Sequence, residues 1–254
     1  MKKWLLILPV ITFSFIVTWA AEPKVTIICD DAKSQFEAIS PEGVRVLMDI
    51  AKPERLSSPA MASDILVTTH SHGDHYLSSF VDSFPGKKLT FETGTLESNG
   101  VKITGIASAH TATLGEFLPW GRRSNYIYLI EMGGLRIAHF GDIGQEKLTA
   151  KQLNILGEID IAITQFSNPY SDVNIDNLKG FHLMDQVKPK LIIPTHIDEP
   201  TARYAAKKWE GFYIVGPLKI GKADLKPEKP KVLFMESWGK KCMGWNIAKQ
   251  WQSN

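Results

Sequence analysis

Cysteine is almost absent from this chain, which has only Cys29 and Cys242 among its 254 residues. So sparse a pair excludes the dense disulfide framework that stabilises many small secreted domains. In an oxidising compartment the two thiols could form one disulfide joining the two ends of the fold, and two separate buried thiols are the alternative. The sequence does not fix the distance between them, so both interpretations stay open.

The chain also has little uninterrupted apolar sequence. The one candidate for a membrane span, residues 4–19, falls short of the roughly 18 to 20 residues that a transmembrane helix needs. It follows two lysines, and Thr18-Trp19-Ala20 offers small residues at the two positions that determine cleavage. We therefore expect residues 1–20 to be a signal peptide, residues 21–254 to form a single domain, and the product to be exported, periplasmic or secreted. An uncleaved membrane anchor is the alternative.

Neither sign of charge dominates. The chain has 29 basic and 27 acidic residues, and removal of the two N-terminal lysines makes these numbers equal. A near-neutral chain lacks the basic surface that favours nucleic acids and anionic membranes, so we expect neither a nucleic-acid partner nor stable membrane insertion after cleavage. With 44% hydrophobic residues the chain can bury a substantial core. The oligomeric state cannot be predicted from these features.

Histidine is scarce too, yet three of the seven histidines lie within six consecutive residues of Thr69-His70-Ser71-His72-Gly73-Asp74-His75. This segment follows the apolar run Ile65-Leu66-Val67, which is typical of a buried strand, so the histidines belong to the loop at its carboxyl end. Such a loop can turn its first two histidines toward one point and its aspartate and last histidine toward a second. Imidazole nitrogen and carboxylate oxygen suit zinc, iron or manganese. The segment predicts a metal site, and a merely histidine-rich turn is the alternative.

His-x-His-x-Asp-His after a strand is the signature of the metallo-β-lactamase superfamily, which this chain resembles over residues 25–234. The resemblance continues downstream at the family's remaining ligand positions, which are His110, Gly141-Asp142 and Pro194-Thr195-His196. Through segments 134–142 and 187–196 the chain is most similar to the branch containing L-ascorbate 6-phosphate lactonase. More distantly it resembles the phospholipase D that cleaves N-acylphosphatidylethanolamines.

The resemblance implies the metallo-β-lactamase fold, an α/β four-layer αββα sandwich with metals at the edge where strand ends converge. It also implies two divalent ions, expected to be zinc, with manganese or iron as alternatives. One ion is held by three histidines and the other by an aspartate and two histidines, while a second aspartate bridges both. These sets are His70, His72 and His110; Asp74, His75 and His196; and Asp142.

The function implied is that of an exported dinuclear metal-dependent hydrolase, in which a metal-bridging hydroxide attacks a small ester, lactone or phosphodiester. Two divalent ions lower the pKa of water from about 15.7 toward 7. The candidate catalytic residue is Asp74, which orients the hydroxide and can return a proton to the leaving group. The alternatives are a phospholipase-like or amide-cleaving hydrolase on the same site, and a non-catalytic metal-binding or sensing protein. An intact Asp74 favours an enzyme, and this superfamily uses one site for many substrates.

The loop from Gly115 to Ser124 comes shortly after His110 and carries the basic pair Arg122-Arg123. Guanidinium groups recognise carboxylate or phosphate by paired hydrogen bonds, so we expect this loop to recruit a small anionic substrate. Solvated arginines, or arginines paired with surface acids, are the alternative. Three residues before Asp142, His139 is expected to point away from that ligand and to lie buried behind the site.

Strands that each lead to a helix suggest two packed sheets with helices outside. Helices are predicted at residues 76–84, 145–156, 176–187 and 200–208. Strands are predicted at residues 25–28, 35–39, 44–49, 64–68, 89–93, 101–107, 126–131, 135–140, 159–164, 191–194 and 231–235. Repeats, low-complexity runs and inter-domain linkers are not found in the sequence.

Overall fold

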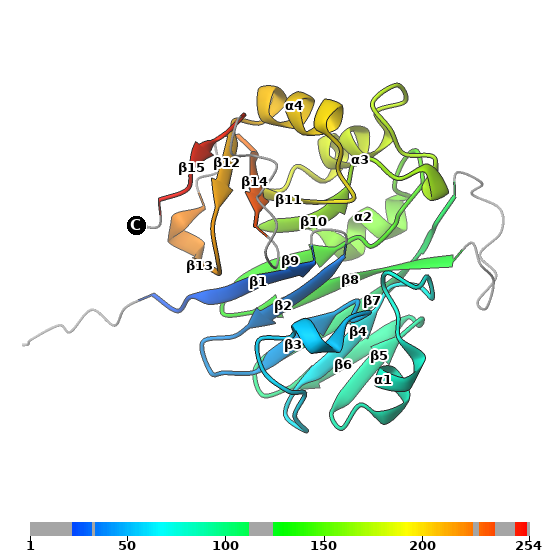
Figure 1. Ribbon diagram of the computed structural model, residues 1–254, viewed down its shortest axis with the longest axis vertical. Helices are drawn as coiled ribbons and strands as arrows, with labels where there is room; N and C mark the ends of the chain where they lie inside the picture. The colour runs from blue at the N-terminus through cyan, green and yellow to red at the C-terminus, as the bar shows by residue number, and fades with distance from the viewer. Residues whose placement is uncertain (1–21, 32–33, 112–123, 226–228, 237–246, 253–254) are drawn as a thin grey trace, which may run out of the picture.

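A computed structural model describes residues 22–31, 34–111, 124–225, 229–236 and 247–252 (Figure 1). The expected signal peptide, Cys242 and the pair Arg122-Arg123 lie outside these ranges, so the expectations about them stay predictions. Within the described ranges, no helix has both the length and the apolar character needed to cross a membrane.

Two β-sheets make up the body of the protein (Figure 1). The first has the strand order β13-β1-β2-β3-β4-β5, antiparallel from β13 to β3 and parallel from β3 to β5. Its strands are β1 (Val25–Asp31), β2 (Gln35–Ile39), β3 (Arg45–Met48), β4 (Ile65–Thr68), β5 (Lys87–Thr90) and β13 (Leu218–Ile220).

The second sheet has the order β15-β12-β14-β11-β10-β9-β8-β7-β6. Strands β6 to β9 pair as antiparallel neighbours, and the pairs from β9 to β15 are parallel. The strands are β6 (Gly94–Ser98), β7 (Val101–Ala109), β8 (Ser124–Met132), β9 (Leu135–His139), β10 (Ile161–Gln165), β11 (Leu191–Thr195), β12 (Gly211–Ile214), β14 (Lys231–Met235) and β15 (Lys249–Gln250).

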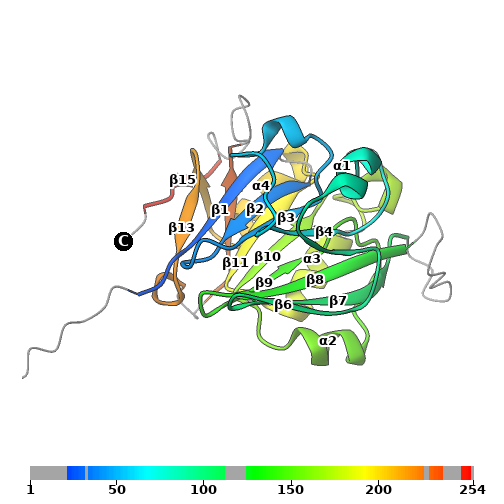
Figure 2. The same cartoon turned by 90° about the horizontal axis from the view of Figure 1, so that it is seen from below.

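Helices cover the outer faces of both sheets, and Figure 2 shows α1 and α2 on opposite sides of the sandwich. The α-helices of the described residues are α1 (Ser78–Ser83), α2 (Ala150–Leu156), α3 (Lys179–Val187) and α4 (Glu199–Lys208). Short 3-10 turns are η1 (Pro53–Arg55), η2 (Pro169–Ser171) and η3 (Lys222–Asp224).

Three apolar clusters correspond to the three interfaces between these layers. The largest lies between the sheets, where Ile27 of β1 and Ile163 of β10 are both fully buried. A second packs α2, α3 and α4 on the nine-stranded sheet and includes Ala162, the neighbour of Ile163. Because successive residues of a strand face opposite sides, β10 contributes to both clusters and is apolar over most of its length. The third packs α1 on β3 and β4. The predicted αββα sandwich is therefore confirmed.

Two of the predicted helices begin three or more residues later than their apolar pattern suggested. We expected a helix from Gln145, but α2 begins at Ala150. The side chain of Gln145 accepts a hydrogen bond from the backbone N–H of Ala109, and Thr149 forms a capping box with Gln152. The capping oxygens fix the first turn, and the residues before it bond to β7 instead.

The start of α3 is displaced for a similar reason. The prediction began at residue 176, whereas α3 begins at Lys179. Before it, the side-chain oxygens of Asn174 and Asn177 accept backbone N–H bonds within two or three residues. Such local side-chain bonds satisfy the backbone outside a helix and hold a turn.

Strands β6, β12, β13 and β15 were not predicted. In β6 only two of five side chains are even partly buried, so the sequence shows little alternation there. The strand exists because it pairs with β7 in register, from Gly94 opposite Gly105 to Ser98 opposite Val101. Pairing with a distant neighbour decides such edge strands more than local pattern does.

The arrangement of strands places several loops at one edge of the sandwich. Strands β7, β9, β10 and β11 run in the same direction, so their carboxyl ends share one edge of the nine-stranded sheet. The loop after β4 reaches the same edge, because the N–H of Tyr126 on β8 donates to the carbonyl oxygen of Thr69 at 3.0 Å. The Tyr128 hydroxyl donates to the carbonyl oxygen of Thr68 at 3.2 Å. All four loops that carry predicted ligands therefore meet at this edge.

A buried charge cluster lies away from that edge, under the loop that contains η1. Arg45 contacts Glu37 at 3.0 Å and Asp64 at 2.5 Å, and all three side chains are almost fully buried. Asp30 is 2% exposed and lies close to the carboxylate of Glu37. Burial, and next the negative charge of Glu37, raise the pKa of Asp30 to about 8. Asp30 therefore keeps its proton at neutral pH.

Replacing Asp30 by asparagine should change how the free energy of unfolding depends on pH. The folded chain holds a proton on Asp30 that the unfolded chain releases above about pH 4, so this group lowers stability as the pH rises from about 4 to 8. Asp30→Asn is uncharged at any pH, so its gain in unfolding free energy over the wild type should grow between pH 5 and pH 8. The upper bound is about 1.4 kcal/mol per pH unit. Urea unfolding at both pH values measures it, with exposed Asp176→Asn as the control. An equal gain in unfolding free energy at pH 5 and pH 8 would show that Asp30 is ionised in the folded chain.

Candidate metal centre

The carboxyl-terminal edge of the strands brings together all seven residues predicted as ligands. They come from the loop after β4 (His70, His72, Asp74, His75), and from the ends of β7 (His110), β9 (Asp142) and β11 (His196). They form two groups, and within each group all the ligand atoms lie within 4.8 Å of one another. One group is His70, His72, His110 and Asp142, and the other is Asp74, His75 and His196.

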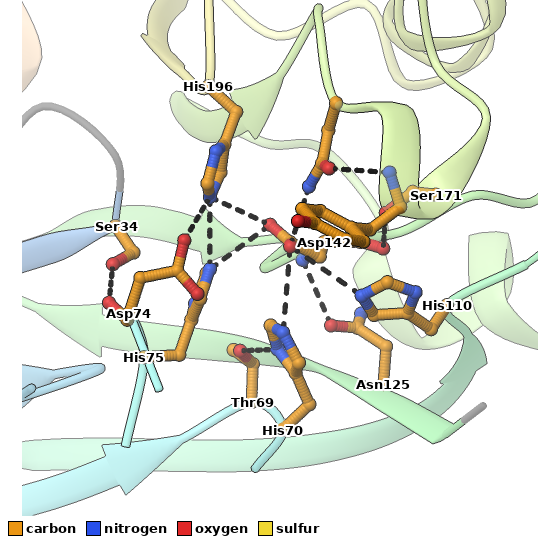
Figure 3. Close-up of polar contacts among 12 residues, drawn as sticks. Ser34, Thr69, His70, Asp74, His75, His110, Asn125, Asp142, Ser171 and His196 are labelled. Atoms are coloured by element: carbon orange, nitrogen blue, oxygen red, sulfur yellow. Dashed lines mark hydrogen bonds and ion pairs between the residues drawn. The ribbon is translucent and has the colours of Figure 1, made fainter. Parts of the chain in front are cut away.

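Asp142 lies between the two groups, as Figure 3 shows. Its Oδ2 is 3.5 Å from Nε2 of both His70 and His110. Its Oδ1 is 3.2 Å from Nε2 of His75 and 3.3 Å from Nε2 of His196. Each carboxylate oxygen therefore faces one group, which is the arrangement of a carboxylate that bridges two cations.

The polar atoms at this point lack the partners that burial normally demands. His70 Nε2, His110 Nε2 and Asp142 Oδ1 are buried and have no hydrogen-bond partner among the described residues. An unsatisfied buried polar group costs about 1–3 kcal/mol, so such atoms are rare unless something binds them. Here the two histidine nitrogens point at Asp142 from separate loops. The residues present fit divalent cations, with imidazole nitrogen and carboxylate oxygen as donors.

The pKa values of the cluster indicate where positive charge is favoured. Burial lowers the pKa of His75, but the carboxylates of Asp142 and Asp49 outweigh it and raise the pKa to about 10. Burial and the charge on His75 lower the pKa of His70 to about 4. The metal-free cluster therefore takes up a proton at His75 between two carboxylates, and a cation bound there must displace that proton.

Gly141 and Asn125 set the position of Asp142. Gly141 has φ +56°, and a Cβ there would lie 2.5 Å from Asn125 Oδ1 and 2.6 Å from the Thr69 side chain. Only glycine fits this turn without a collision. The side chain of Asn125 donates to the carbonyl oxygen of Phe140 at 2.8 Å and accepts from the N–H of Asp142 at 3.0 Å. This amide fixes the chain on both sides of the glycine.

His196 has a strained backbone, with φ +34° directly after β11. Its carbonyl oxygen accepts from the N–H of Phe166 at 3.2 Å and of Ser167 at 2.6 Å, in the loop after β10. A left-handed conformation is unfavourable for a residue with a Cβ, and it persists where neighbouring contacts determine it. The two bonds hold the imidazole toward His75, whose Nε2 is 3.1 Å from Nε2 of His196.

Asp49 is a site residue that the sequence analysis missed. It is fully buried at the end of β3, behind the ligands. Oδ1 accepts from the N–H of Thr69 at 2.7 Å, and Oδ2 accepts from the Thr69 hydroxyl at 2.8 Å. Oδ2 also lies 2.8 Å from His75 Nδ1 and 2.7 Å from His139 Nε2. Its carboxylate therefore orients His75, whose Nε2 faces Asp142. The predicted buried position of His139 behind the site is confirmed.

A second missed residue is Asn168, in the loop after β10. Its side chain is 2% exposed, and its Nδ2 donates to Asp142 Oδ2 at 2.7 Å and to Gln165 Oε1 at 2.8 Å. It therefore restrains the same oxygen of Asp142 that faces His70 and His110. A carboxylate held in this way keeps its orientation between the two groups of ligands without a cation.

Comparison with known proteins supports the resemblance to the metallo-β-lactamase superfamily. The family model described as the β-lactamase superfamily domain matches residues 33–196. Among curated proteins, the UPF0173 metal-dependent hydrolase of Thermococcus onnurineus is 26% identical over 167 residues, covering 58% of this chain and 70% of the relative. A hydrolase of the same description from Thermus thermophilus is 28% identical over 153 residues, covering 53% of this chain and 65% of the relative.

Solved structures show the same fold. A metallo-β-lactamase superfamily protein from Thermotoga maritima matches with a TM-score of 0.60 at 22% identity, covering 84% of this chain and all of that one. The metallo-β-lactamase fold protein YhfI of Bacillus subtilis matches with a TM-score of 0.56 at 11% identity, covering 85% and 98% of the two chains. At these identities the likeness concerns the fold alone.

Weakening the support behind His75 should lower metal affinity. Asp49→Asn keeps the shape but replaces one acceptor oxygen by an N–H₂ that faces His75, His139 or Thr69. We expect zinc affinity to fall 10- to 100-fold, as is usual when such a supporting residue is changed. Chelator competition measures it. Asp160→Asn is the matched control, because Asp160 is equally buried but bonds Lys190 and Lys222. Unchanged zinc affinity in Asp49→Asn would show that the Asp49 carboxylate does not support metal binding.

Proposed function

This chain belongs to the family of the β-lactamase superfamily domain, and from that premise we propose that it is an exported dinuclear hydrolase of a small ester, lactone or phosphodiester. Metal-dependent hydrolysis is the activity for which its curated relatives are named. The observation that carries the proposal is the position of Asp142, whose two oxygens face two separate sets of histidines. Export rests on the signal-peptide pattern of residues 1–20.

The two groups around Asp142 divide the ligands between two cations. His70, His72 and His110 would hold one, and Asp74, His75 and His196 the other, with Asp142 common to both. A pair of divalent ions supplies an activated water at neutral pH and draws electron density from a carbonyl or phosphoryl oxygen. The chain itself supplies the fixed geometry. Asp49 and Asn168 hold His75 and Asp142 in place before a cation binds.

Asp74 is the group best placed to handle protons. Its side chain is 36% exposed, whereas that of Asp142 is 3% exposed, so Asp74 is the carboxylate that an incoming substrate can reach. Its Oδ2 lies 3.7 Å from Nε2 of His196, and the Ser34 hydroxyl donates to its carbonyl oxygen at 2.5 Å. The carboxylate of Asp74 would accept a proton from the attacking water and return it to the leaving oxygen.

The substrate class is the finer part of the proposal. Similarity to the branch containing L-ascorbate 6-phosphate lactonase favours a lactone or phosphate-bearing substrate. The basic pair of the loop after His110 favours an anionic one. A phospholipase-like or amide-cleaving activity would use the same ligands, and a metal sensor would use them without Asp74 as a proton carrier.

Metal content tests the two-ion proposal. Wild-type protein loaded with zinc and freed of excess should contain two ions per chain, because seven ligands in two groups are available. His72→Ala removes a ligand of the first group and leaves the second intact, so it should retain one ion. Elemental analysis measures both. One ion or none in the wild type would contradict the dinuclear centre.

Turnover tests the role of Asp74. Wild type should hydrolyse at least one member of a panel of lactones, esters and phosphodiesters. Asp74→Asn keeps an oxygen ligand but loses the proton acceptor, so kcat should fall by about 10²–10⁴-fold with little loss of stability. Exposed Asp82→Asn, on α1, is the control. Tight metal binding with no turnover in the wild type would favour the sensor alternative instead.

A further inference from the structure

Among the described residues, the metal cluster is exposed mainly at His72 and Asp74. His70, His75, His110 and Asp142 are each at most 4% exposed. Asp74 is far more exposed, and His72 is partly exposed. We therefore expect a substrate to approach on the side of His72 and Asp74.

Tyr170 stands next to that opening. It is 78% exposed, the highest value among the exposed large hydrophobic side chains of the described residues. The centroid of its ring lies 6.5 Å from that of His72, with the planes at 64°. The ring therefore borders the approach to a predicted ligand of the first cation while keeping most of its surface in water.

The loop that carries Tyr170 is fixed on both sides of it. Asn168 and Val173 pair as an isolated β-bridge with backbone bonds of 2.7 and 3.0 Å. Between them, Ser171 is fully buried, and its hydroxyl donates to the carbonyl oxygen of Asp142 at 3.1 Å. The backbone N–H of Tyr170 itself donates to Asn168 Oδ1 at 3.0 Å. The loop is thus attached to the metal centre through Asp142.

The next residue adds a further anchor. Asp172 has a left-handed backbone, with φ +51°, and its Oδ2 lies 2.6 Å from Nζ of Lys179 on α3. None of these bonds uses the phenol of Tyr170. The loop therefore holds an exposed aromatic ring in a defined place, although the ring contributes little to holding the loop. An apolar surface left in water gains free energy when a ligand covers it.

We propose that Tyr170 is a substrate-contacting residue that determines specificity: its ring packs on the apolar part of a substrate whose reacting group lies at the cluster. The chemistry that fits is an acid derivative with an alkyl or aromatic acyl group. The polar end faces His72 and Asp74, and the apolar group covers the ring. This inference rests on the proposed hydrolytic site, and it adds a preference for substrates with an apolar acyl group.

Binding of carboxylate products tests this contact without turnover. Calorimetry on zinc-loaded protein would compare hexanoate with acetate, which share the carboxylate and differ in apolar length. Wild type should bind hexanoate roughly tenfold more tightly, because the added methylenes cover the ring. Tyr170→Ala should reduce that ratio to below about threefold and leave acetate binding unchanged. Tyr170→Phe, which keeps the ring, should keep the ratio.

Tyr204→Ala is the matched control, because Tyr204 is a partly exposed tyrosine on α4, packed against Phe181. It should keep the wild-type ratio. An unchanged ratio in Tyr170→Ala, or no preference for hexanoate in the wild type, would overturn the inference. Loss of the ratio in Tyr170→Phe would overturn it too, since the hydroxyl would then be the contact. Absence of hydrolysis with an intact ratio would count against the proposed function alone.

Discussion

Four histidines meet on one carboxylate, that of Asp142, and the architecture of the functional edge follows from this contact. The histidines come from loops after β4, β7 and β11, so the contact requires both sheets to bring their strand ends to one point. Asp142 reaches it because Gly141 turns where a Cβ would collide with Asn125 and Thr69. Such a concentration of buried imidazole and carboxylate is costly without a cation, and it is the strongest physical reason for expecting one.

The surrounding residues make this arrangement rigid. Asp49 holds His75 from behind, and its bonds to Thr69 also fix the start of the histidine loop. In the loop after β10, Asn168 donates to the side chain of Asp142, and the Ser171 hydroxyl donates to the backbone carbonyl oxygen of Asp142. A centre built in this way is preorganised, so binding energy is not spent on ordering the ligands. The same contacts position Tyr170 at the opening, which links substrate access to the geometry of the centre.

The sequence predicted the layers of the fold and the seven clustered residues, but it did not predict what supports them. His70, His72, Asp74 and His75 could be found because histidine is scarce and these residues form one short motif after an apolar strand, whereas the resemblance to the superfamily implied His110, Asp142 and His196. Asp49 gives no such signal: an aspartate ending a strand is common, and its role depends on β3 lying beside β4. Asn168 likewise acts only because β10 lies beside β9. The late starts of α2 and α3 were missed because side-chain oxygens bond to the backbone before each helix, against the apolar pattern.

The central claim is that two cations share the carboxylate of Asp142. Anomalous diffraction from crystals grown with zinc, measured on both sides of the zinc absorption edge, tests this most directly. The account predicts two anomalous peaks per chain, one among His70, His72 and His110 and one among Asp74, His75 and His196, with an oxygen of Asp142 directed at each. A single peak, or peaks that leave Asp142 without a metal contact, would contradict it.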